Sequence, residues 1–143
     1  METTKCSCEV TPGNVMILAC SGGSNVGQLS NQVAVELTVE GCGRMYCLAG
    51  IGGRLSGFVQ SAKDAPAVVV IDGCEIGCAK ATMESAGVPF GSYIVISKDL
   101  GIEKNKNFNL SREDIDRVKS AVKALIASMN VTETAKGAES CCC

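Results

Sequence analysis

The sequence predicts a three-layer α/β domain in which a short, mostly parallel sheet is covered by helices on both faces. Three observations lead to this prediction. Short apolar runs, suited to buried strands, alternate with segments whose apolar residues recur at helical spacing. The connections between them are short, and parallel strands need helical crossovers of this kind. The length of 143 residues is that of one domain, large enough to bury a core without metal or disulfides.

The first four elements are predicted in the N-terminal half of the chain. The continuous apolar run at 15–19 is suited to a buried parallel strand. Apolar residues at helical spacing then predict a helix from Val26 until Gly41 ends the pattern. Residues 44–49 indicate a weaker second strand. A shorter helix around 55–59 follows it among several glycines.

The C-terminal half begins with the strand that the sequence predicts most strongly. Residues 67–71 contain three consecutive valines between a proline and a glycine, which favours the centre of the sheet. A third helix is predicted at 74–86 and a fourth strand at 93–97. After a polar connection, the last helix is predicted from a cap at Ser111 and from an apolar stripe that reaches Met129. The strand order expected for this alternation is 2-1-3-4.

The domain is predicted to span residues 14–130. Residues 1–13 are expected to form a polar tail and residues 131–143 a mobile C-terminal tail. Both tails carry cysteines, which are Cys6, Cys8, Cys141, Cys142 and Cys143. On exposed segments these thiols could capture soft metals or pass sulfur to a partner, or they could have no function.

The composition excludes several classes of protein. Apolar residues make up 46% of the chain and charged residues 20%, as in globular domains. The net charge is −2 and no run of Lys and Arg interleaves with aromatic residues, so nucleic-acid binding is not expected. No apolar stretch approaches the roughly 20 residues of a membrane span, and the N-terminus lacks the apolar core of a secretory signal. We therefore expect a soluble, cytoplasmic protein that does not bind membranes.

Ten cysteines and the absence of histidine determine which site chemistry the chain can offer. In a reducing cytoplasm these cysteines are thiols that can bind metal or carry out sulfur chemistry, and they do not form a disulfide framework. Without imidazole, a metal site has to use thiolates or carboxylates.

Four cysteines follow predicted strands at the carboxyl edge of the sheet, and they are Cys20, Cys47, Cys74 and Cys78. In an open parallel sheet, ligands bind at this edge where the strand order reverses. With the order 2-1-3-4, Cys20 would lie beside Cys74 and Cys78, and Cys47 would approach from the neighbouring strand. Four thiolates suit tetrahedral Zn²⁺, so the set can hold one zinc ion. Each cysteine taken singly could equally be a small buried apolar residue.

Three segments around these cysteines resemble the DGC-domain family. The segments are Cys20-Ser-Gly-Gly-Ser-Asn-Val-Gly-Gln28, Met45-Tyr-Cys-Leu-Ala-Gly-Ile-Gly-Gly-Arg54 and Ile71-Asp-Gly-Cys-Glu-Ile-Gly-Cys-Ala-Lys80. That family is named for its Asp-Gly-Cys motif and is described as zinc-binding through four cysteines, which here match Cys20, Cys47, Cys74 and Cys78. The resemblance spans roughly residues 15–126 and implies a metal site. It does not include Cys6, Cys8, Cys42 or Cys141 to Cys143.

The loop after the first strand is a second candidate binding site, and its residues are Gly22, Gly23 and Ser24. Its backbone N–H groups could point at an anion, or the loop could simply be a tight turn beside a metal. It is not a P-loop, because Gln28 and Leu29 stand where a lysine and a hydroxyl are needed. A cysteine phosphatase is disfavoured, because Val26 occupies the position of the phosphate-binding arginine.

The charged residues nearest these motifs have mostly structural interpretations. Asp72 is expected to orient the turn after its strand through backbone hydrogen bonds rather than to act in catalysis. Arg54 is expected either to offset the negative charge of a four-thiolate zinc centre or to lie in a surface salt bridge. Lys104 and Lys106, in a polar loop, are interpreted as solvated surface residues.

The leading hypothesis for the function is a cytoplasmic zinc-binding protein that stores, delivers or senses metal, with no protein partner indicated. The alternative is a thiol enzyme that transfers sulfur or electrons. Its nucleophile would be Cys20 or Cys74, with a pKa lowered by a helix N-terminus. A third hypothesis is an iron–sulfur cluster held by the same four thiolates.

Overall fold

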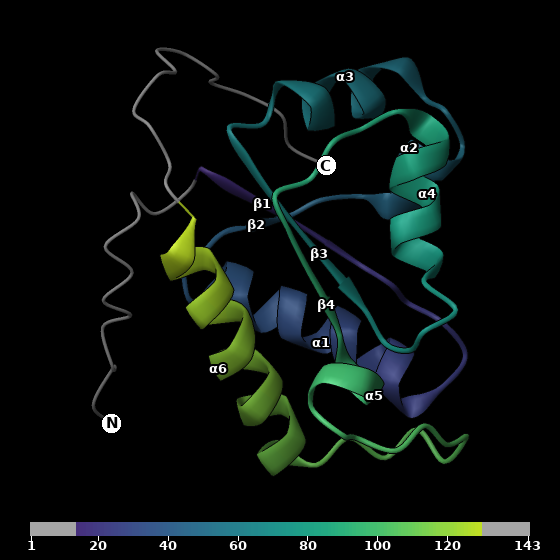
Figure 1. Cartoon of the computed structure of the whole chain (residues 1–143), viewed down its shortest axis with the longest axis vertical. Coiled ribbons are helices and arrows are strands. Elements are labelled where there is room, and N and C mark those ends of the chain that lie inside the picture. The colour runs from purple at the N-terminus through teal and green to yellow at the C-terminus, as the bar shows by residue number, and fades with distance from the viewer. Residues whose placement is uncertain (1–13, 130–143) are drawn as a thin grey trace.

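The computed structural model describes residues 14–129, which form a four-stranded sheet between two layers of helices (Figure 1). The strands are β1 (Val15–Ala19), β2 (Arg44–Met45), β3 (Ala67–Asp72) and β4 (Ser92–Val95). All neighbours pair in parallel, and the order is β2-β1-β3-β4. The predicted fold class and strand order are confirmed. The predicted tails, with Cys6, Cys8 and Cys141 to Cys143, lie outside the described residues.

Each face of the sheet packs against its own group of helices. Figure 1 shows α1 (Asn25–Val39) and α6 (Arg112–Ser128) on one side. On the other side lie α2 (Leu48–Gly52), α3 (Ser56–Asp64) and α4 (Cys78–Ala86). Successive strand residues point to opposite faces. Val69 therefore packs in the core beneath α1 and α6, and Val70 packs in the core beneath α2, α3 and α4. All six residues of β3 are buried, which explains why its sequence is almost wholly apolar.

Several element boundaries differ from those predicted. The second strand has two residues instead of six, because the chain leaves the sheet edge after Met45 and enters α2. The glycine-rich region that follows holds two helices, α2 and α3, instead of one. The fourth strand ends at Val95, where a short helix, α5 (Ile96–Asp99), begins. Helix α4 begins at Cys78 and not at residue 74, because the residues between form a turn.

The last helix has the predicted cap, since the Ser111 side chain accepts a hydrogen bond from the N–H of Asp114. Its apolar stripe is buried against the sheet and α1 through Ile115, Val118 and Val122. Helix α6 therefore closes the first face as predicted. No helix within residues 14–129 is long and apolar enough to cross a lipid bilayer.

An ion-pair cluster joins α1 to α6 at the surface. Glu36 accepts from Arg112 and from Lys119, and Glu40 accepts from Lys119 and Lys123. Partial burial by itself would raise the pKa of both carboxyls. Hydrogen bonds from the basic side chains, together with their charges, outweigh burial, so the pKa values of Glu36 and Glu40 are lowered.

This cluster makes the stability of the domain pH-dependent. A carboxyl whose pKa is lower in the folded state stabilises the fold above its unfolded pKa, and this contribution disappears as the pH falls through the folded pKa. We expect the free energy of unfolding, measured by urea denaturation, to drop below about pH 5. In Glu36→Gln/Glu40→Gln this drop should shrink by about 1 kcal/mol. The control is Glu84→Gln on the exposed side of α4, and an unchanged pH slope in the double variant would contradict the assignment.

Candidate functional site

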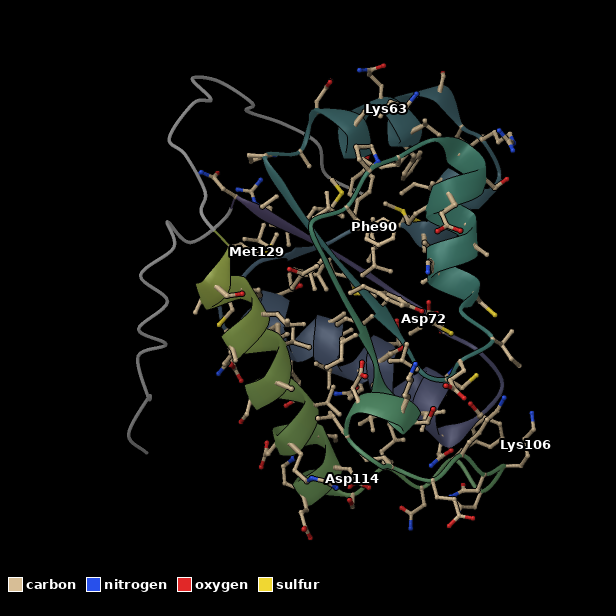
Figure 2. All side chains as sticks on the ribbon, viewed as in Figure 1. Lys63, Asp72, Phe90, Lys106, Asp114 and Met129 are labelled. Atoms are coloured by element: carbon tan, nitrogen blue, oxygen red, sulfur yellow. The ribbon has the colours of Figure 1, made fainter. Side chains whose placement is uncertain are left out.

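A cavity of about 180 Å³ lies at the carboxyl ends of β1 and β3, where the strand order reverses. Three of the four predicted cysteine ligands line it, and they are Cys20, Cys74 and Cys78. The rest of the wall comes from the loop after β1, from Asp72 and Gly73, from Ile76, and from Lys104 and Lys106. Figure 2 shows Asp72 in the sheet and Lys106 on the loop between α5 and α6, at the lower right. We call this space the thiol cavity.

Cys20 is the most buried of these three thiols, with 8% of its surface exposed. Burial raises the pKa of the Cys20 thiol, although backbone hydrogen bonds from Gly22 and Gly73 to its sulfur act in the opposite direction. The neighbouring Asp72 and Cys78 raise the pKa further. The prediction that Cys20 has a lowered pKa is therefore wrong, because burial raises its pKa by more than the backbone donors lower it.

Asp72 fixes the turn that carries Cys74 and Cys78. Its carboxylate is 1% exposed and accepts hydrogen bonds from the N–H of Ala79 at 2.8 Å and of Lys80 at 3.0 Å. These N–H groups belong to the first turn of α4, so Asp72 caps the helix that begins with Cys78. The predicted role of Asp72, orienting the turn through backbone hydrogen bonds, is confirmed.

Tyr93 adds a third hydrogen bond to this carboxylate, with its hydroxyl 2.9 Å from Asp72 Oδ2. Burial and the carboxylate raise the pKa of Tyr93, so its hydroxyl stays a donor. Gly77 closes the turn just before α4 with φ of 70°, in the left-handed region that favours glycine. Residues 72–78 therefore have a fixed conformation that does not depend on the cysteine side chains.

Glycines allow the loops on both sides of the cavity to touch. A Cβ added at Gly73 would lie 2.6 Å from the backbone N of Gly27 in the first turn of α1. A Cβ added at Gly27 would lie 2.7 Å from the carbonyl oxygen of Gly22. The first turn of α1 thus packs backbone to backbone against the turn after β3. This contact brings Cys20 and Cys74, which are 54 residues apart in the numbering, to one cavity.

Lys104 and Lys106 are exposed, as predicted, but they are also functional candidates, because each side chain has a partner within the protein. The Lys104 ammonium donates to Cys74 Sγ at 3.4 Å, and that of Lys106 donates to the carbonyl of Gly23. Both lysines line the thiol cavity. Their loop is held by Asn25, the buried first residue of α1, whose side chain pairs with the backbone of residues 103 and 105. A polar asparagine directly after the Ser24 cap was the available signal, but its partner is 80 residues away.

Most of the glycine-rich loop's hydrogen-bond donors are satisfied within the protein. Gly22, Gly23 and Ser24 all line the cavity, as the anion-binding hypothesis requires. However, the N–H of Ser24 donates to the carbonyl of Gly22, and that of Asn25 to the carbonyl of Asn105. The Ser24 side chain accepts from the N–H of Gly27. The first turn of α1 is therefore capped by the protein itself.

Cys47 lies outside the residues that line the thiol cavity. It is exposed and immediately precedes α2. Helix α2 contacts α4, since a Cβ at Gly52 would lie 3.3 Å from the Thr82 side chain. Cys47 and Cys78 therefore stand at the start of two neighbouring helices. Across residues 14–129, no three His, Cys, Asp or Glu side chains are gathered so that they could hold a metal ion.

Arg54 pairs with Ser85 among the described residues and not with a carboxylate. Its guanidinium donates to the carbonyl and hydroxyl oxygens of Ser85 near the C-terminal end of α4, at 2.9 and 2.7 Å. It lines a different cavity, together with Thr82 and Ala86. Arg54 thus satisfies a carbonyl at the end of a helix, as basic side chains often do.

Comparison with known proteins places the chain in a family. Residues 16–122 match the DGC domain. A curated relative, the anaerobic and virulence modulator AnvM of Pseudomonas aeruginosa, is 30% identical over 103 residues, which cover 72% of this chain and 78% of the relative. No solved structure matches this chain significantly. The family match covers most of the chain, including the loops that line the thiol cavity, so this chain belongs to the DGC domain family.

Proposed function

We propose that this protein binds a zinc ion at the thiol cavity, through Cys20, Cys74 and Cys78, with Cys47 as the fourth ligand. The observation that carries the proposal is the common cavity, to which two separate strand ends contribute thiols. Because the described side chains are not gathered around one point, zinc binding would require the thiols to turn toward one another. Sulfur is a preferred ligand of zinc, and an all-thiol set agrees with a chain that has no histidine. Cys47 is the proposed fourth ligand because it immediately precedes α2, the helix that packs beside α4.

The surroundings of Cys20 suit a metal ligand better than a free nucleophile. Its pKa is raised by burial, so the metal-free thiol keeps its proton at neutral pH. A bound metal supplies the positive charge that keeps such a sulfur deprotonated. The backbone donors of Gly22 and Gly73 are already directed at this sulfur, and hydrogen bonds of this kind stabilise metal-bound thiolates.

We propose a regulatory rather than a structural use of this metal. A domain with two apolar cores around one sheet does not need an ion to fold. The relative is named an anaerobic and virulence modulator, and metal or redox sensing in a reducing cytoplasm would agree with that name.

The test is a zinc competition with a chromophoric chelator under reducing conditions. The protein used is the full chain with Cys6, Cys8 and Cys141 to Cys143 replaced by serine, so that tail thiols do not compete. We expect one zinc per chain and at least about a 100-fold loss of affinity in Cys74→Ser. Cys42→Ala, which changes a buried cysteine outside the cavity, is the control and should keep its zinc. Far-ultraviolet circular dichroism should be unchanged in both variants.

Equal affinity in Cys74→Ser and Cys42→Ala would overturn the proposal. Brown protein purified without air would indicate an iron–sulfur cluster on the same thiols. Metal-free protein in which one cysteine is alkylated unusually fast would support the second candidate, a thiol enzyme.

The second candidate function rests on the surroundings of Cys74. This thiol is half-buried, lines the cavity and receives a hydrogen bond from the Lys104 ammonium. Reactive cysteines are typically found in such partly exposed, electropositive places. A thiolate at Cys74 would attack the electrophilic sulfur of a disulfide or a persulfide in the same cavity, forming a new S–S bond while the other sulfur leaves as a thiolate.

A further inference from the structure

We propose that the thiol cavity binds a small carboxylate anion, held by the ammonium groups of Lys104 and Lys106 beside the thiols. What the protein does with the bound anion depends on the proposed function. The anion subsite itself depends only on the cavity and its charges, so it can be tested on metal-free protein.

The charges on the cavity wall favour an anion. Lys104 and Lys106 both line it, and their ammonium groups donate to the Cys74 sulfur and to the Gly23 carbonyl. Among residues 14–129, Asp72 is the one carboxylate on this wall. Both of its oxygens are already occupied by hydrogen bonds from α4 and from Tyr93. The two ammonium charges thus have no carboxylate counter-ion within the cavity.

The backbone that carries Lys104 is held in place before any ligand binds, while the side chains of Lys104 and Lys106 are exposed. The Asn25 side chain donates to the carbonyl of Glu103 at 2.8 Å and accepts from the N–H of Asn105 at 2.6 Å. The N–H of Asn25 donates back to the carbonyl of Asn105. Three hydrogen bonds from one buried residue therefore clamp the backbone on both sides of Lys104. Two lysines on a fixed backbone lose less entropy on binding than two lysines on a loose loop.

The lysine side chains provide the charge that recognises the anion. The N–H groups of Ser24, Asn25 and Gly27 all have partners within the protein. The cavity, with a volume of about 180 Å³, limits the ligand to a small molecule. A small organic acid suits this space. Because the Lys104 ammonium lies beside the Cys74 thiol, the ligand class is a small carboxylate whose second group can meet sulfur.

Two alkylating reagents of nearly equal size test the subsite. Iodoacetate carries a carboxylate and iodoacetamide is neutral, and with both the thiolate sulfur forms a bond to carbon while iodide leaves. The measurement is the ratio of the two rates at each cysteine, read by peptide mass mapping on metal-free protein without tail cysteines. We expect this ratio to be about fivefold higher at Cys74 than at Cys47, which lies outside the cavity.

The lysine variants decide whether the cavity causes this preference. In Lys104→Gln/Lys106→Gln, the ratio at Cys74 should fall to that at Cys47, while the iodoacetamide rate sets the scale for any general change in reactivity. Lys98→Gln is the matched control, because Lys98 is an exposed lysine paired with Glu75 and lies outside the thiol cavity. Equal ratios at Cys74 and Cys47 in the unmodified cavity would overturn the subsite. So would an equal effect of Lys98→Gln. Neither result would bear on zinc affinity, which is measured separately.

Discussion

Gly73→Ala is expected to destabilise the domain by about 3 kcal/mol, at the upper end of the usual cost of overpacking. The added Cβ would lie 2.6 Å from the Gly27 nitrogen and from the Val26 carbonyl carbon. These are backbone atoms of another element, so no rotation of a side chain can relieve the contact. Relief requires α1 and the turn after β3 to move apart, which would also separate Cys20 from Cys74.

Urea denaturation and zinc affinity together check this prediction. The matched control is Gly57→Ala in α3, where the added Cβ meets nothing within 4 Å and the helix gains about 0.5 to 1 kcal/mol. Gly73→Ala should lower both the stability and the affinity, whereas Gly57→Ala should leave the affinity unchanged. A Gly73→Ala protein as stable as Gly57→Ala would mean that the two backbones do not approach as closely as described.

The parts of the fold that the sequence predicts well are those buried on both sides. Residues 15–19 and 67–71 have continuous apolar runs because β1 and β3 are central strands covered by helices on two faces. β2 pairs over two residues at the sheet edge, which is too short for any periodicity to appear. The sequence predicts one helix where the structure has α2 and α3, because a single sequence does not distinguish glycines at helix boundaries from glycines within helices.

The positions of three of the four cysteines could also be predicted from the sequence. The rule that parallel strands end at one edge is enough to predict that Cys20, Cys74 and Cys78 share a cavity. Cys47 was placed by the same rule, but its strand ends two residues earlier and the chain turns into α2. The metal itself stays a prediction from the thiols and the family.

Long-range polar contacts were beyond the reach of sequence patterns. Lys104 and Lys106 lie in a loop with no periodicity, and hydrogen bonds to Asn25 determine where that loop goes. Arg54 similarly pairs with Ser85, 31 residues away. Such pairs depend on how the folded helices and strands pack together. The sequence around each residue therefore carries no signal of its partner.

Asp72→Ala is expected to cost about 4 kcal/mol, because it removes the acceptor of three hydrogen bonds at a site that is 1% exposed. Asp72→Asn should cost about 3 kcal/mol even though it keeps the shape. In the carboxylate, one oxygen faces the N–H of Ala79 and the other faces that of Lys80 and the Tyr93 hydroxyl. Whichever position the amide NH₂ takes, it would point at another donor.

Comparison of Asp72→Asn with Tyr93→Phe separates the capping of α4 by the carboxylate from the packing around it. Tyr93→Phe removes one donor and leaves the carboxylate on α4, so it should cost only about 1 kcal/mol. Asp72→Asn should also increase hydrogen exchange at the amides of Ala79 and Lys80 and the alkylation rate of Cys78, because the first turn of α4 loses its cap. Tyr93→Phe should change neither. Protected Ala79 and Lys80 amides in Asp72→Asn would show that α4 starts at Cys78 without help from Asp72. The motif's aspartate would then need another explanation than positioning the thiol next to it in the cavity.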